Sequence, residues 1–227
     1  MNLSFKNFSI RIIGYLPYII FFYVIYTIEI FRELLLYNGL LQLMLFLIVA
    51  CIPAYLTKRM SYVDIAWPWG LVLIGALVLL LGDGYKPRIF LISGMYLFSG
   101  LRMGIGALIL LKKGHLDTEL SRYTYQRRRW KKAGYKNLDI SLQYEIMIQC
   151  FANITFLALP AILMAQNTAT SISVIEIIGA SLWAVWFVLE HVSDMQKQQF
   201  LKKSFLEKKK KQVCNAGFWK YSRHPNY

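Results

Sequence analysis

Six long apolar stretches constrain this chain more than any other feature of its sequence. A helix that crosses a bilayer needs about 20 mostly apolar residues. Only 17% of the residues are charged and 57% are hydrophobic, whereas about a quarter of the residues in a soluble domain are charged. The sequence therefore predicts an all-α fold, a polytopic membrane helix bundle with about six transmembrane helices, at roughly 10–31, 34–56, 63–82, 88–111, 142–165 and 172–193.

The positive charges predict how this bundle is oriented. If the N-terminus is cytoplasmic, alternate loops place 22 of the 26 Lys and Arg residues inside and only Arg32, Lys86 and Arg88 outside, while Arg102 lies within the fourth segment. Cytoplasmic loops of membrane proteins carry the excess of Lys and Arg, so we expect a cytoplasmic N-terminus and cytoplasmic basic loops. The net charge of +14 would suit nucleic acid or an anionic membrane surface. The hydrophobicity favours the lipid bilayer and argues against nucleic acid.

Several apolar segments carry ionisable or amide side chains that a bilayer disfavours. One interpretation is structural: Arg102 would pair with Asp64 or Glu190, and the amides would join helices by hydrogen bonds. The interpretation favoured for the whole set is a polar cavity between the helices, open to the cytoplasm. The polar residues of the segments are Asp64, Arg102, Glu145, Gln149, Asn153, Glu190 and Asp194, and those expected to line the cavity, together with Trp67, are Arg102, Gln149 and Glu190.

Other site classes have no support in the sequence. The His and Cys residues lack metal-ligand spacing, so no metal site is predicted. There is no glycine-rich phosphate loop and no Ser or Cys nucleophile signature. The first apolar stretch is too long for a signal peptide and is not followed by a small-residue cleavage site, so it is expected to be a retained transmembrane helix.

Four motifs follow one another in a fixed order between residues 61 and 227. They are SYVDIAWPWG, RYTYQRRRW, EHVSDMQKQQF and GFWKYSRHPNY. In this order they resemble the steroid 5-alpha-reductase superfamily, most closely a bacterial branch of multi-pass membrane proteins. The C-terminal half is also similar to isoprenylcysteine carboxyl methyltransferases, which share the Arg-His-Pro string. The resemblance divides the chain into an N-terminal transmembrane hairpin, 1–60, and a steroid-reductase-like membrane domain, 61–227.

The resemblance implies an integral membrane oxidoreductase in the bacterial inner membrane. Such an enzyme would use NADPH, held in a cavity that faces the cytoplasm, to reduce a conjugated double bond in a steroid-like or isoprenoid lipid. Asp64 lies in the region expected to supply or orient the catalytic acid, with Tyr62 or Tyr123 as the direct proton donor. The residues that match cofactor-binding positions are Arg122, Asp194, Arg223, His224, Asn226 and Tyr227.

Two alternatives stay open on this evidence. A membrane methyltransferase would use the same Arg-His-Pro string with S-adenosylmethionine as its cofactor, although the acidic helix end in EHVSDMQKQQF is typical of the reductases. Members of the superfamily continue beyond Pro-Asn-Tyr with at least one further helix. The chain is therefore expected to be C-terminally truncated, and the second alternative is an inactive truncated membrane protein.

Overall fold

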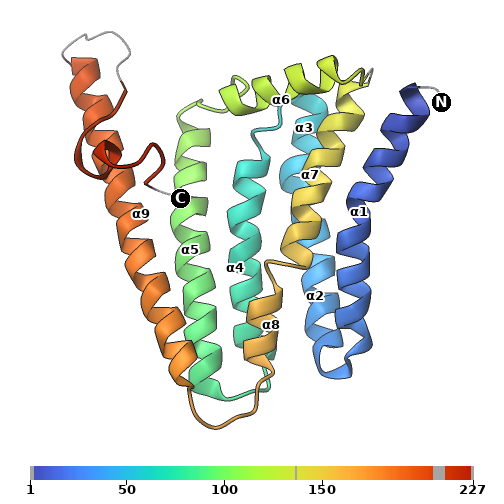
Figure 1. Ribbon diagram of the computed structural model, residues 1–227, viewed down its shortest axis with the longest axis vertical. Helices are drawn as coiled ribbons and strands as arrows, with labels where there is room; N and C mark the ends of the chain where they lie inside the picture. Colours follow the sequence, from blue (N-terminus) through green and yellow to red (C-terminus); the bar gives the residue numbers. More distant parts are fainter. Residues whose placement is uncertain (1–2, 136, 207–212, 226–227) are drawn as a thin grey trace. The chain divides into compact units, whose positions relative to one another are not determined.

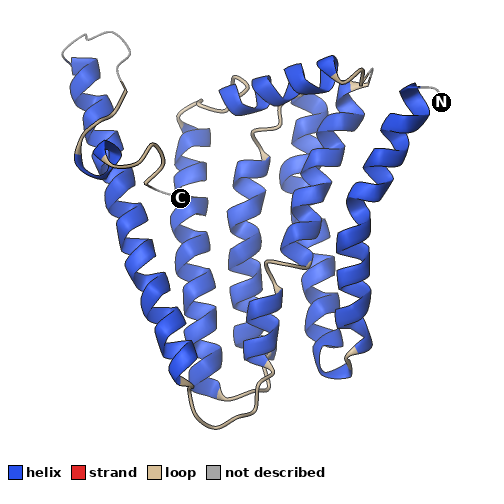
Figure 2. Ribbon diagram, in the orientation of Figure 1, coloured by secondary structure: helices blue, strands red, loops and turns tan. Residues whose placement is uncertain are grey.

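The computed structural model describes residues 3–135, 137–206 and 213–225, which form helices and short connections (Figures 1 and 2). No strand occurs among these residues. The all-α membrane bundle predicted from the sequence is confirmed, while its orientation in the membrane stays a prediction. Within the described residues, six helical segments are long and apolar enough to cross a membrane: Ser9–Thr27, Glu29–Thr57, Val63–Leu81, Lys86–Lys112, Leu138–Ala165 and Val174–Ser204.

The chain divides into two compact units, which we call unit 1 (Met1–Ser171) and unit 2 (Ile172–Tyr227). Unit 2 contains α9 (Val174–Leu206) and a short 3-10 helix, η2 (Gly217–Lys220). The boundary at residue 60, between the N-terminal hairpin and the steroid-reductase-like domain, stays a prediction. Unit 1 contains α1 (Leu3–Thr27), α2 (Glu29–Phe46), a π-helical turn η1 (Leu47–Cys51), α3 (Ile52–Thr57), α4 (Val63–Leu81), α5 (Lys86–Lys112), α6 (Ser121–Lys132), α7 (Leu138–Ile154) and α8 (Leu159–Ala165).

The first two helices are joined by a tighter turn than the sequence predicted. Instead of a loop near residues 32 and 33, the chain turns at Ile28 alone, which has an extended backbone (φ −88°, ψ 107°). Glu29 then lies in the first turn of α2, where the helix dipole favours a carboxylate. Arg32 is consequently part of α2, where it donates a hydrogen bond to the Tyr26 carbonyl oxygen at 3.2 Å.

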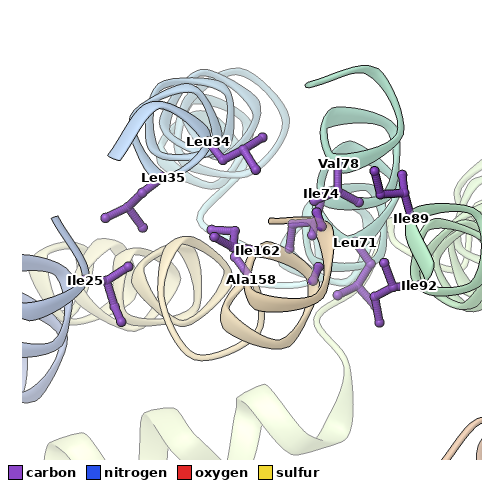
Figure 3. Close-up of a cluster of buried hydrophobic side chains, with 12 residues drawn as sticks. Ile25, Leu34, Leu35, Leu71, Ile74, Val78, Ile89, Ile92, Ala158 and Ile162 are labelled. Carbon is purple, nitrogen blue, oxygen red and sulfur yellow. The ribbon is translucent and has the colours of Figure 1, made fainter. Parts of the chain in front are cut away.

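Helix α4 packs against α2, α5, α7 and α8 and so forms the centre of unit 1. Its contact with α5 is close because position 100 has no side chain: a Cβ added to Gly100 would lie 2.8 Å from the carbonyl oxygen of Pro68. Two clusters of buried apolar side chains fill the space between the helices. The first surrounds Leu71, Ile74 and Ile162 (Figure 3), and the second, which reaches α6, surrounds Phe46, Val63, Ile146 and Trp130.

Helix α6 lies across the end of unit 1 at which α5 ends and α7 begins (Figure 1). Its Trp130 is buried in the second cluster, which orients the helix. Arg128, Arg129, Lys131 and Lys132 remain exposed on its other side. Lys58, also predicted to lie in an inside loop, is at the same end, because its carbonyl oxygen accepts a hydrogen bond from Arg127 of α6.

Arg88 departs from its expected place in an exposed loop. It belongs to α5 and is only 1% exposed. Its guanidinium donates hydrogen bonds to the carbonyl oxygens of Asn167, Ala169 and Ser171 at 3.0, 2.8 and 2.5 Å. A buried guanidinium is tolerated where its donors are satisfied, so Arg88 serves to fix the connection that follows α8.

Candidate functional site

Asp64 lies in the first turn of α4 and contacts two residues of α6. The Tyr123 hydroxyl donates a hydrogen bond to Oδ1 of Asp64 at 2.5 Å. Arg122 donates from Nη2 to Oδ2 of the same carboxylate, and its guanidinium carbon lies 4.9 Å from the centroid of the Tyr123 ring. Three predicted site residues are therefore in contact, and we call them the Asp64 group (Asp64, Arg122 and Tyr123).

The surroundings of Tyr123 keep its phenol protonated. The side chain packs against the second hydrophobic cluster, and this burial raises the pKa of Tyr123 well above its usual value of 10.0, with a further rise from the charge and the hydrogen bond of Asp64. Burial lowers the pKa of Arg122, but the Asp64 charge and the Tyr123 contact outweigh it, so the net change is upward. The group thus combines a neutral phenol with a charged guanidinium around one carboxylate.

Glu119 lies in the connection that precedes α6 and forms hydrogen bonds with the residues just before α4. The backbone N–H of Met60 donates to both of its carboxylate oxygens at 3.1 Å, and the Ser61 hydroxyl donates to Oε1 at 2.9 Å. Arg127 donates to Oε2 from Nε and Nη2 at 3.1 and 2.9 Å. Tyr62 provides no side-chain cap for α4, and Glu119 instead holds the two residues that precede Tyr62. It thereby holds Asp64 opposite α6.

The two candidate proton donors have different environments. Tyr62 packs against the second hydrophobic cluster, and its hydroxyl makes no hydrogen bond with any described residue. Tyr123 is the tyrosine that contacts Asp64. Geometry therefore favours Tyr123 over Tyr62 as the donor that works with Asp64, a role that stays a prediction.

A buried network of amides joins α2, α4 and α7 deeper in unit 1. Gln42 donates to the Gly70 carbonyl at 2.8 Å and to Asn38 Oδ1 at 3.2 Å, and Asn153 donates to the Trp67 carbonyl at 3.2 Å. All three amide residues are at most 2% exposed. Asn38 also donates to two carbonyls at the end of α7, where the helix leaves them without a regular partner. Asn153, one of the polar residues noted in the fifth segment, thus joins helices.

The residues predicted to line a polar cavity have different local environments. The indole of Trp67 packs against both hydrophobic clusters, and Arg102 is half-buried in α5. Gln149 is half-buried in α7, and its amide forms no hydrogen bond within the described part of the chain. Glu190 belongs to α9 of unit 2. The lining predicted for these four residues stays a prediction.

In unit 2 the segment that follows α9 folds back onto the end of this helix. The Trp219 indole N–H donates to the Ser193 carbonyl at 2.8 Å, and the Phe218 backbone N–H donates to Gln196 Oε1 at 2.9 Å. The Ser193 hydroxyl donates to the Pro225 carbonyl at 3.3 Å. The two C-terminal motifs of the sequence, EHVSDMQKQQF and GFWKYSRHPNY, are therefore in contact with each other.

This fold-back brings the backbone next to Asp194 close to the backbone next to Arg223 and His224. Asp194 directly follows Ser193 in α9, while Arg223 and His224 directly precede Pro225. The His224 backbone N–H donates to the Ser222 hydroxyl at 3.2 Å, which fixes the turn. Asn226 and Tyr227, also predicted to bind the cofactor, lie outside the described residues.

Sequence reasoning missed three residues that organise these sites. Asn38 and Gln42 have the i, i+4 spacing that drew attention to the fifth segment, so the same signal in the second segment would have identified them. Glu119 carried a weaker signal, a carboxylate within a strongly basic loop. Its partners Met60, Ser61 and Arg127 come from separate parts of the chain, so its role depends on the tertiary structure.

Comparison with known proteins identifies the family. The family described as "Protein of unknown function (DUF1295)" matches residues 42–227. That range contains the Asp64 group, Glu119 and both C-terminal motifs. No curated protein and no solved structure shows a significant match. The chain belongs to the DUF1295 family of membrane proteins, which is part of the steroid 5-alpha-reductase-like superfamily.

Proposed function

We propose that this protein is an NADPH-dependent membrane oxidoreductase that reduces a carbon–carbon double bond conjugated to a carbonyl group in a steroid-like or isoprenoid lipid. The observation that carries the proposal is the hydrogen bond from Tyr123 to Asp64, made by a phenol that burial keeps protonated. Membership of the superfamily supports it. The six apolar helices are consistent with a bilayer location, where a lipid substrate would be found.

Reduction of an enone requires a hydride donor and an acid that hydrogen-bonds to the carbonyl oxygen. NADPH supplies the hydride when it is bound. Tyr123 would turn its O–H from the Asp64 carboxylate to the substrate carbonyl and donate its proton there, and a proton from water would restore the phenol. Asp64 would orient the phenol through the hydrogen bond that joins them.

The basic side chains beside the Asp64 group fit the phosphates of NADPH. The Arg122 side chain is 55% exposed even though it pairs with Asp64. Arg128, Arg129, Lys131 and Lys132 are exposed, and none of the four forms an ion pair with a carboxylate of the described residues. Guanidinium groups bind phosphate through two parallel hydrogen bonds. We assign the phosphates to α6, and on the family resemblance alone Asp194 of unit 2 would contact the ribose or the nicotinamide amide.

The cofactor assignment is tested by NADPH binding to the purified full-length protein in lipid nanodiscs, followed by quenching of tryptophan fluorescence. Arg122→Gln and Asp194→Ala should each weaken binding by about tenfold or more, the effect of losing a charge-assisted hydrogen bond. Arg32→Gln, which removes an Arg from the α1–α2 end of unit 1, is the matched control and should bind as the wild type does. Unchanged binding by both test variants would contradict the assignment.

Titration of the same preparations with S-adenosylmethionine addresses the alternative reaction. The Arg223-His224-Pro225 string is shared with the membrane methyltransferases, so its presence alone does not separate the two activities. Saturable binding of S-adenosylmethionine without binding of NADPH would favour a methyltransferase over the proposed reductase.

A further inference from the structure

A cavity of about 330 Å³ opens at the end of unit 1 opposite to the Asp64 group. Helix α4 begins beside Asp64 and ends at Leu81, which lines the cavity. With a rise of 1.5 Å per residue, the two places lie roughly 25 Å apart along α4. The volume is at the lower end of the range for small-molecule sites. The cavity is therefore separate from the proposed reductase site and has room for a small ligand.

Three carboxylates line this cavity, and no Lys, Arg or His of the described residues lines it. Glu29 and Glu33 lie one turn apart on α2, and Asp83 lies in the connection after α4. None of the three side chains forms an ion pair or a hydrogen bond with another residue that the structure describes. The helix dipole accounts for Glu29 in the first turn of α2, but not for Glu33 and Asp83. The charge of the lining favours a cation.

Gln166 provides a second, independent indication of a ligand. It is only 7% exposed and lines the cavity, yet its side-chain amide has no hydrogen-bond partner in the described part of the chain. The side-chain amide atoms of Gln166 are not fully buried. Their remaining accessible surface faces the cavity that Gln166 lines. An N–H donor on the ligand would satisfy the amide oxygen, whose isolation is otherwise costly.

The lining also restricts the kind of cation. The described residues contain no group of three or more His, Cys, Asp or Glu placed to hold a metal ion, which disfavours a metal here. Quaternary ammonium groups favour aromatic faces, and no described aromatic side chain lines the cavity. Ile30 and Leu81, 50% and 38% exposed, provide an apolar border for an alkyl chain. A primary ammonium group with an alkyl tail matches all of these features.

We propose that this cavity binds a protonated primary amine, which would donate to Gln166 and be attracted by the negative charges of Glu29, Glu33 and Asp83 in the lining. The amine could come from an ethanolamine phospholipid or from a soluble alkylamine, since both present the same ammonium group on an apolar chain. Binding here does not depend on the proposed reductase activity, because the cavity and the Asp64 group have no residue in common.

The test uses the full-length protein in phosphatidylcholine nanodiscs. In one arm the protein is titrated with hexylamine and with hexyltrimethylammonium, and binding is followed as a shift in the thermal unfolding midpoint. In the other arm, phosphatidylethanolamine replaces part of the phosphatidylcholine, and native mass spectrometry measures the lipid that the protein retains. Preference for the primary amine in either arm supports the proposal, and the arm in which it appears identifies the source. Equal binding of the trimethylated compound, or no preference in either arm, overturns it.

Substitutions of the lining residues test whether the amine binds in this cavity. The triple variant Glu29→Gln, Glu33→Gln, Asp83→Asn should bind the primary amine about tenfold more weakly, as expected when several partly exposed charge contacts are lost together. Gln166→Leu retains the carboxylates and should also weaken binding. Asp117→Asn removes one carboxylate at the Asp64 end and is the control. Wild-type affinity in both test variants contradicts the proposed site, whatever the outcome of NADPH binding measured on the same preparations.

Discussion

Tyr123 donates its phenolic hydrogen to Oδ1 of Asp64 at 2.5 Å, although 59 positions separate the two residues in the chain. One residue lies in the first turn of α4 and the other at the start of α6. Their contact therefore depends on how α6 docks onto the beginning of α4. Glu119 secures that docking because it binds the backbone before α4 and the Arg127 side chain of α6 together.

The raised pKa of Tyr123 predicts a specific dependence of stability on pH. A phenol with a folded-state pKa above its unfolded value of about 10 contributes stability that is complete below pH 10 and is lost as the pH rises further. The difference in free energy of unfolding between the wild type and Tyr123→Phe should be constant up to about pH 10 and then shrink. Reversible unfolding in mixed micelles across this range measures it. A difference that grows with alkaline pH contradicts the assigned environment.

Glu119→Gln should destabilise the protein by about 2 kcal/mol, because it leaves the Arg127 charge uncompensated in a largely enclosed position. The two side chains are 16% and 20% exposed. The pair Lys58–Asp139 provides the control, since its side chains are 51% and 48% exposed. Asp139→Asn should cost less than about 1 kcal/mol. Unfolding in mixed micelles compares them, and an equal loss in the two variants would contradict the role given to Glu119.

Gly70→Ala should disrupt the amide network inside unit 1. A Cβ at this position would overlap the Asn153 amide and lie 2.6 Å from Gln42 Oε1. Such overpacking typically costs about 1–3 kcal/mol. Gly106→Ala is the matched control: no atom of the described residues lies within 4 Å of a Cβ there, and Ala should be tolerated or slightly stabilising in a helix. Thermal unfolding of both variants should separate them, and a stable Gly70→Ala protein would show that the network can rearrange.

The helices could be predicted from the sequence because hydrophobicity alone specifies a membrane-spanning segment. The turn between α1 and α2 could not, because Ile28 is an apolar residue without a turn signal. Arg88 was also misplaced. A charge next to a spanning segment suggests an exposed loop, whereas its burial depends on three carbonyls that lie about 80 residues later in the chain and converge only in the folded protein.

The candidate site could be predicted in part. Motif resemblance and an unusual carboxylate identified Asp64, Arg122 and Tyr123 individually, and the structure shows that they touch. Their contact was not predictable, because Asp64 and α6 belong to separate segments. The predicted lining by Trp67, Arg102 and Gln149 rested on polar side chains in apolar segments and on the family resemblance, and it stays a prediction. Polarity does not distinguish a side chain that faces a cavity from one that satisfies a neighbouring helix, as Asn153 does.

The most direct test of the reductase proposal is the oxidation of NADPH by the purified full-length protein in nanodiscs, supplied with a panel of steroid and isoprenoid enones. The wild type should oxidise NADPH only when an enone is present and should form the saturated ketone. Tyr123→Phe should lower the turnover rate by roughly 10²- to 10⁴-fold, the usual contribution of a general acid. Tyr125→Phe, which changes a neighbouring tyrosine that is 65% exposed, should retain wild-type turnover. Undiminished turnover in Tyr123→Phe, or no enone-dependent oxidation by the wild type, would contradict the account.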